Sequence, residues 1–275
     1  MSMHILVPLD NSSYASAAGE VAMQIAAAQP SRLTALRVVN VRPRSGNLLE
    51  DLPGSIGFEP AIVSPELAKE RGDEATALVV DWAQAARARG LEANGVVEVG
   101  AVGQTILEHA DRADLVVMGL RGETEERFPR QGGQLLGWLA NRIETPVLWV
   151  APSVTELTSV VVGYDGSDSA DHAIRLIRRF IVPLGIPVHG VYVSADGTGG
   201  EVLSSLEEQL PECEVHLHVI AGSQPHEALV KQAEALSSEL LVLGFQGHSA
   251  LKDALFGTTT EHILLESKLA VLVGR

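Results

Sequence analysis

The residues best suited to chemistry are glycines and threonines near the end of the sequence. Four of them follow the spacing G-x2-G-x9-G-[ST], and they are Gly244, Gly247, Gly257 and Thr258. Thr259 adds a second hydroxyl, and His248 either contacts a ligand from within this segment or is solvated. Glycine lets backbone N–H groups approach a phosphate, and a helix beginning at the last glycine adds partial positive charge. The segment therefore predicts a site for a di- or triphosphate.

An aspartate follows the first apolar run of each half of the chain. Asp10 ends ILVPLD, and Asp165 ends VVVGYD and precedes Gly166. In an open parallel sheet, ligands bind beyond the carboxyl ends of the strands, where the strand order reverses, and a carboxylate there can accept hydrogen bonds from a nucleoside. Val193 ends the next expected strand of the second half. We therefore place Asp165, Gly166 and Val193 at one binding edge, where no base catalysis is required.

Short apolar runs alternate with helical patterns along the whole chain. The strands expected in the first half are His4 to Pro8, Leu33 to Val41, Gly95 to Val99, Asp114 to Gly119 and Pro146 to Val150. The helices expected there are Tyr14 to Ala28, Pro65 to Arg89, Gln104 to Arg112 and Gln134 to Arg142, with a long loop from Arg42 to Pro60. Strands that alternate with helices in this way favour a parallel, doubly wound sheet.

The second half repeats this order, and the repeat predicts a duplication. Val160 to Ala170 takes the place of Ile5 to Ala15, and Ser238 to Gly247 that of Ala113 to Gly122. The further strands expected are Pro187 to Val193, Glu214 to Ile220, Leu240 to Gly244 and Ala270 to Val273. The helices expected are Asp168 to Phe180, Gly200 to Leu210, Pro225 to Leu236 and Thr258 to Glu266. The predicted domains are residues 1–152 and 153–275, joined by a linker short enough that they pack on each other.

This repeated architecture, with its glycine spacing and its aspartate turns, resembles the universal stress protein family in its tandem two-domain form. The resemblance implies an α/β fold of two tandem doubly wound, five-stranded parallel-sheet domains, with adenine nucleotide alpha hydrolase-like or flavodoxin-like layering. It also implies a pseudo-dimer paired through the last strands, and a role in stress response. By resemblance, Asp165 and the main chain of Val193 face adenosine. The residues around ribose and phosphates would be Gly244, Gly247, Gly257, Thr258 and Thr259.

The first half departs from the pattern. Gly119 and Gly122 are present, but Gly133 or Gln134 stands where the hydroxyl residue belongs. The phosphate-facing loop from Glu123 to Glu126 carries three carboxylates, which would repel a polyphosphate unless Arg127, Arg130 or a metal ion compensates. We expect this site to be weak or dead. Asp10 and Val38 remain adenosine contacts, and a role as a partner surface for the second half is equally open.

Composition limits the other functions. The formal net charge of −15 opposes approach to nucleic acid or to an anionic membrane. We find no signal-peptide pattern and no apolar run of the roughly 18 residues that span a bilayer, so we expect a soluble cytoplasmic protein. The lone Cys213 excludes an intrachain disulfide. His216 and His218 share a strand face without a nearby acidic or sulfur ligand, and we interpret them as surface histidines rather than a metal site.

The sequence contains no signature of a P-loop NTPase, dehydrogenase, serine hydrolase or zinc protease. Our first hypothesis is therefore a non-catalytic regulatory protein that binds ATP, ADP or AMP, with or without magnesium. In this hypothesis the loop from His248 to Phe256 becomes ordered over the phosphates when the nucleotide binds. The ordering changes a surface that an unknown protein partner recognises. The alternatives are a weak ATPase or nucleotidyl-chemistry enzyme and a nucleotide-free scaffold. A further homodimer stays open.

Overall fold

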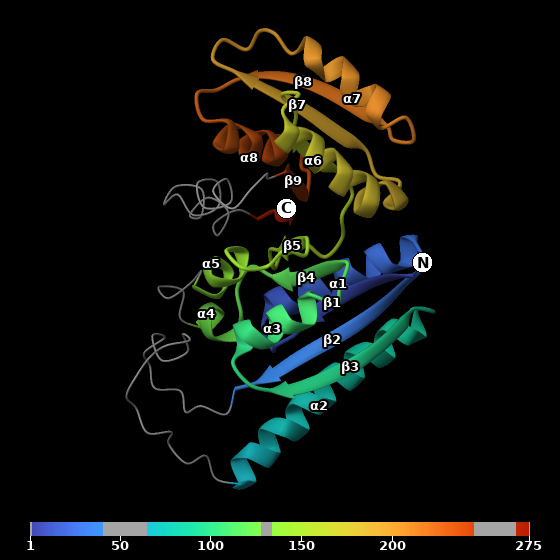
Figure 1. The fold of residues 1–275 in the computed structure, drawn as a ribbon, viewed down its shortest axis with the longest axis vertical. Helices are drawn as coiled ribbons and strands as arrows, with labels where there is room; N and C mark the ends of the chain where they lie inside the picture. Colours follow the sequence, from blue (N-terminus) through green and yellow to red (C-terminus); the bar gives the residue numbers. More distant parts are fainter. Residues whose placement is uncertain (1, 41–64, 128–133, 245–267, 275) are drawn as a thin grey trace.

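The computed structural model describes residues 2–40, 65–127, 134–244 and 268–274, and their strands form one sheet (Figure 1). The strands are β1 Met3–Pro8, β2 Ser31–Val39, β3 Glu92–Val99, β4 Leu115–Gly119, β5 Val147–Val150, β6 Val160–Gly163, β7 Val188–Ser194, β8 Val215–Ala221, β9 Leu240–Gly244 and β10 Ala270–Gly274. The α-helices are α1 Ser13–Ala28, α2 Pro65–Ala88, α3 Val102–Ala110, α4 Glu123–Arg127, α5 Gln134–Ala140, α6 Asp168–Leu176, α7 Ser204–Gln209 and α8 Pro225–Ala235. No helix in these ranges is long and apolar enough to cross a membrane.

The sheet confirms the predicted fold class. Its order is β3-β2-β1-β4-β5-β10-β9-β6-β7-β8, so each half has five strands in the same arrangement. Every pairing within a half is parallel. The two last strands, β5 and β10, pair antiparallel, with Leu148 opposite Leu272. The halves therefore form a pseudo-dimer with one continuous sheet, while the predicted domain boundaries stay a prediction.

The same local chemistry starts the first helix of each half. Ser12 caps α1 by accepting a hydrogen bond from Ala15 N–H at 3.1 Å, and Ser167 caps α6 through Ala170 N–H at 3.2 Å. Such a serine cap contributes about 1 kcal/mol to a helix. α1 is rich in buried alanine, which lets its backbone lie close to the sheet. The cap and the small residues thus fix where each helix begins and how closely it packs.

Two of the expected helices are broken into shorter pieces. The segment predicted as one helix from Asp168 is α6 followed by a π-helical turn, Ile177–Ile181, and a 3-10 turn, Val182–Leu184. Pro183 lies in that last turn. Because proline has no backbone N–H, it cannot donate the hydrogen bond that would continue an α-helix. The segment predicted from Gly200 starts as a 3-10 turn, Glu201–Leu203, and then becomes α7. The long loop and the last helix of the prediction lie outside the described residues.

Side chains near the sheet junction also hold the halves together. The Gln24 amide of α1 donates from Nε2 to Leu157 O and accepts from Leu157 N–H, both at 2.8 Å. Arg179 forms an ion pair with Asp114 of the first half. Leu157 lies in the connection between the halves and is buried. Gln24 therefore provides hydrogen-bond partners for the backbone N–H and C=O of Leu157. Without Gln24, these buried groups would lose their hydrogen bonds to water on folding and gain none from the protein.

Replacing Gln24 by alanine tests this contact. Gln24→Ala should lower the free energy of unfolding by about 1–3 kcal/mol, because it leaves a buried N–H and C=O without partners. The measurement is urea denaturation followed by circular dichroism. Gln104→Ala is the control, since Gln104 makes an exposed contact to Glu108 and should change stability by less than about 0.5 kcal/mol. Equal effects of both substitutions would show that the Gln24 contact does not stabilise the junction.

Candidate functional site

The structure brings the described part of the predicted site to one edge of the second half. Asp165 and Gly166 follow β6, Val193 is next to last in β7, and Gly244 ends β9. β6 lies between β7 and β9 and is parallel to both, so the carboxyl ends of these strands meet. The remaining predicted contacts lie outside the described residues, and they are Gly247, His248, Gly257, Thr258 and Thr259. The described residues thus contain the predicted adenosine contacts and the first glycine of the predicted phosphate segment.

The two aspartates that the repeat makes equivalent have different surroundings. Asp165 is exposed, and its Oδ1 accepts a hydrogen bond from Ser167 N–H at 3.0 Å within the turn. Asp10 uses both carboxylate oxygens. Its Oδ1 accepts from the backbone N–H of Ser12 at 2.9 Å and from the Ser12 hydroxyl, and its Oδ2 accepts from Glu123 N–H at 2.7 Å. Asp10 is therefore bound to the protein at the position where Asp165 faces solvent.

The acidic segment of the first half is a helix, where the sequence predicted a loop. Residues Glu123–Arg127 form α4, and Glu126 accepts hydrogen bonds from the N–H and hydroxyl of Ser13, the first residue of α1. Glu123 pairs with Arg37 at 3.6 Å and with Arg127 at 3.1 Å. The backbone N–H groups at a helix start attract anions, and at the start of α1 the carboxylate of Glu126 is that anion. These two carboxylates bind donors of the protein. The segment is therefore a helix rather than the predicted loop, and Arg127 is one of the compensating residues that the sequence analysis had named.

The first glycine of each G-x2-G pair is required by packing. A Cβ at Gly119 would lie 2.6 Å from Tyr14 Cβ, and a Cβ at Gly244 would lie 1.8 Å from Ser169 O. Tyr14 and Ser169 are equivalent residues of the repeat, in α1 and α6. The second glycine of the first pair, Gly122, has Asp10 Oδ2 at 3.0 Å from its Cβ position. Helix packing and the Asp10 contact thus account for the first pair without a ligand.

Sequence reasoning missed a segment at the same edge, the turn of residues 194–200. Asp196 Oδ1 accepts hydrogen bonds from Thr198 N–H at 3.0 Å and from its hydroxyl at 2.7 Å, and the Thr198 side chain lowers the pKa of this carboxyl. Three glycines here have positive φ, and they are Gly197, Gly199 and Gly200. The signal in the sequence was the run Asp-Gly-Thr-Gly-Gly after a strand. The segment follows Val193 directly and belongs to the same edge.

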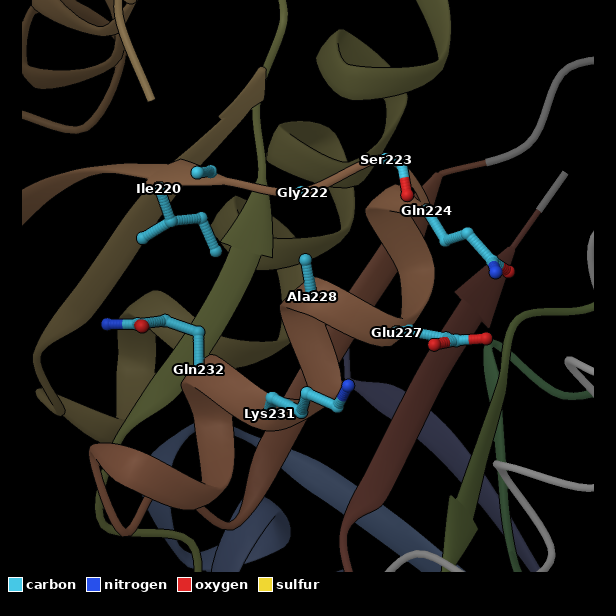
Figure 2. Close-up of a pocket in the computed structure, with 9 residues that line it drawn as sticks. Ile220, Gly222, Ser223, Gln224, Glu227, Ala228, Lys231 and Gln232 are labelled. Atoms are coloured by element: carbon cyan, nitrogen blue, oxygen red, sulfur yellow. The ribbon is translucent and has the colours of Figure 1, made fainter. Parts of the chain in front are cut away.

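A surface hollow of about 360 Å³ lies beside this edge, between β8 and α8 (Figure 2). Ile220 of β8 faces the part of α8 that carries Ala228 and Gln232 (Figure 2). Neither Asp165 nor Gly244 lines it. Among the residues that the structure describes, no cluster of histidine, cysteine or acidic side chains is arranged to hold a metal ion. The hollow is therefore separate from the described part of the candidate site.

Comparison with known proteins agrees with the fold and the repeat. The model of the universal stress protein family matches residues 1–150 and 203–275. A universal stress protein of Synechocystis sp. is 24% identical over 288 residues, covering 99% of both chains. The crystal structure of a universal stress protein from Archaeoglobus fulgidus DSM 4304 has a TM-score of 0.75 at 22% identity, covering 99% of this chain and 96% of that one. A functionally unknown protein from Pseudomonas aeruginosa PAO1 has a TM-score of 0.60 at 15% identity, with 99% and 92% covered.

Alanine at the packed glycines tests their structural role. Gly119→Ala and Gly244→Ala should each lower the free energy of unfolding by about 1–3 kcal/mol, because the added methyl group meets a packed helix. Gly72→Ala is the control. A Cβ at Gly72, in α2, meets nothing within 4 Å, so this change should stabilise the helix by about 0.5–1 kcal/mol. A Gly119→Ala protein as stable as Gly72→Ala in urea denaturation would refute the packing explanation.

Proposed function

The chain belongs to the universal stress protein family, and on that premise we propose that it is a non-catalytic regulatory protein whose second half binds an adenine nucleotide. The observation that carries the proposal is the difference between the two equivalent aspartates. Asp165 is exposed at the carboxyl edge, whereas both oxygens of Asp10 accept hydrogen bonds from the protein. Within the described residues, only the second half therefore leaves this carboxylate available to a ligand.

The residues at the second edge suit a nucleoside. The Asp165 carboxylate would accept hydrogen bonds from a ribose hydroxyl or an adenine amine, beside the backbone of Val193. Gly244 begins the glycine segment, whose backbone N–H groups would approach the phosphates of ATP, ADP or AMP. A magnesium ion, where present, would neutralise phosphate charge. Among the described residues, Asp165, Val193 and Gly244 are those we assign to nucleotide binding.

The proposed role is regulatory rather than catalytic. Phosphoryl transfer needs cationic groups that neutralise charge in the transition state. The segment from Gly244 to Thr259 contains only His248 and Lys252 as basic side chains. We propose that nucleotide binding orders this segment and changes a surface that a partner protein reads, in a cytoplasmic stress response. Slow hydrolysis of bound ATP is the most catalysis that this set of residues supports.

The first half contributes structure in this proposal. At the start of α1, Glu126 occupies the N–H and hydroxyl of Ser13 that an anionic ligand would otherwise use. Asp10 is held between Ser12 and Glu123 N–H. A nucleotide would have to break these contacts before it could bind. The first half therefore supports the sheet, and the second half binds the ligand.

Nucleotide stoichiometry and a matched pair of variants test the proposal. Mass analysis of the denatured protein should find about one adenine nucleotide per chain, or calorimetric titration with ATP and magnesium should find one site. Asp165→Ala should weaken binding by about tenfold or more, since hydrogen bonds to a charged group contribute about 1.5–3 kcal/mol. Asp10→Ala should leave affinity unchanged and lower stability, because it removes the acceptor of three donor groups.

Four results would contradict the proposal. Two nucleotides per chain would show that the first half also binds. Equal sensitivity to Asp10→Ala and Asp165→Ala would place the site elsewhere. A complete lack of binding would favour the nucleotide-free scaffold, and steady turnover of ATP that Asp165→Ala abolishes would favour an enzyme.

A further inference from the structure

The two outer strands of the sheet are protected to different degrees. An outer strand has unpaired backbone groups, and proteins usually shield it with charges, proline or a covering element. β3, at one end, carries Glu92 and Glu98, and α2 packs along it. β8, at the other end, has no Lys, Arg, Asp, Glu or Pro between Val215 and Ala221. Within the described residues, β8 is thus the less protected edge.

β8 also exposes apolar side chains. Four large hydrophobic residues are exposed in the described ranges, and two of them, Leu217 at 38% and Val219 at 41%, lie on β8. They are two positions apart, so they share one face of the strand. α8 makes its main contacts with β6, β7 and β9. The exposed apolar pair therefore lies directly beside the unpaired edge.

The opposite face of β8 carries histidines that contact a third histidine of β7. The ring of His189 stacks on that of His216 with centroids 5.0 Å apart, and its Nδ1 lies 3.1 Å from His218 Nε2 in a hydrogen bond. His216 Nε2 is 3.2 Å from a Glu214 oxygen, a neighbour that the sequence analysis overlooked. Burial lowers the pKa of His189 and of His218, and the neighbouring histidines lower both further. Near neutral pH the His189 and His218 rings therefore carry little positive charge.

The pattern of β8 is complementary to itself. We propose that β8 pairs antiparallel with β8 of a second copy of this chain, across a two-fold axis at His218, joining two ten-stranded sheets edge to edge. This register places Leu217 opposite Val219 of the partner and Val219 opposite the partner's Leu217. Such cross-strand apolar pairs stabilise a sheet, and the new ladder satisfies the unpaired backbone groups. The pairing does not depend on nucleotide binding.

The same register makes the dimer sensitive to acid. It places His218 opposite the partner's His218, and like charges directly opposite each other destabilise a sheet. The other charged groups nearby are Glu214 at the start of β8, and Glu227, Lys231 and Glu234 on α8. A pKa that folding lowers means that the folded protein binds fewer protons than free imidazole does. Association is therefore strongest where His218 is neutral, and it weakens as the pH falls through the lowered pKa of His218 in the folded chain.

The test measures the mass of the full chain in solution at pH 7.5 and 0.15 M salt over a range of concentrations, by light scattering after gel filtration. The wild type should form a dimer. Val219→Lys should shift it to the monomer, because the substitution places an ammonium group opposite the partner's Leu217. Val99→Lys is the matched control, since Val99 is exposed at 66% at the end of β3, and it should remain dimeric. Thermal melts of both variants check that they fold.

Several outcomes would overturn the proposal. A wild-type monomer at every concentration would exclude the dimer. A folded Val219→Lys protein that is still dimeric, or loss of the dimer in Val99→Lys, would place the interface elsewhere. As an independent readout, hydrogen exchange of β8 amides should slow as the concentration rises, and unchanged exchange would contradict β8 pairing. As the pH is lowered from 7.5, the wild type should dissociate at a higher pH than His218→Gln, and dissociation of both at the same pH would refute the His218 axis.

Discussion

Antiparallel pairing between β5 and β10 is the interaction on which the rest of this structure depends. Each is the last strand of its half, and alone it would leave a row of unsatisfied N–H and C=O groups at a sheet edge. The pairing brings Trp149 opposite Val271 and Leu148 opposite Leu272, and all four side chains are buried. The halves therefore share one sheet, and its outer strands in the described structure are β3 and β8.

Within each half, a second constraint fixes the binding edge. The first helix must approach the fourth strand so closely that the strand ends in glycine, Gly119 under Tyr14 and Gly244 under Ser169. That approach brings the serine-capped start of the helix next to the carboxyl ends of the strands. The same packing thus builds an anion-attracting edge twice, once in each half of the duplicated chain.

The halves differ in what occupies that edge. In the first half, Glu126 of α4 accepts a hydrogen bond from Ser13 at the start of α1, and the backbone N–H of Glu123 donates to Asp10. The Glu123 carboxylate forms an ion pair with Arg37. The second half keeps Asp165 exposed, and the Asp196 turn follows β7 at the same edge of the sheet. The two halves therefore keep the same scaffold and differ at a few side chains: Asp10 accepts internal hydrogen bonds from Ser12 and Glu123, whereas Asp165 is exposed.

The sequence by itself determined the alternation of strands and helices, the duplication and the positions of Asp10 and Asp165, because periodicity and turn residues act over short stretches of chain. Only the tertiary structure decided how distant residues meet. Glu126 reaches Ser13, and His189 stacks on His216, through strand order and helix packing that no local pattern encodes. The acidic segment was taken for a loop for this reason: its charge was visible in the sequence, whereas Ser13, which donates to Glu126, lies more than a hundred residues away.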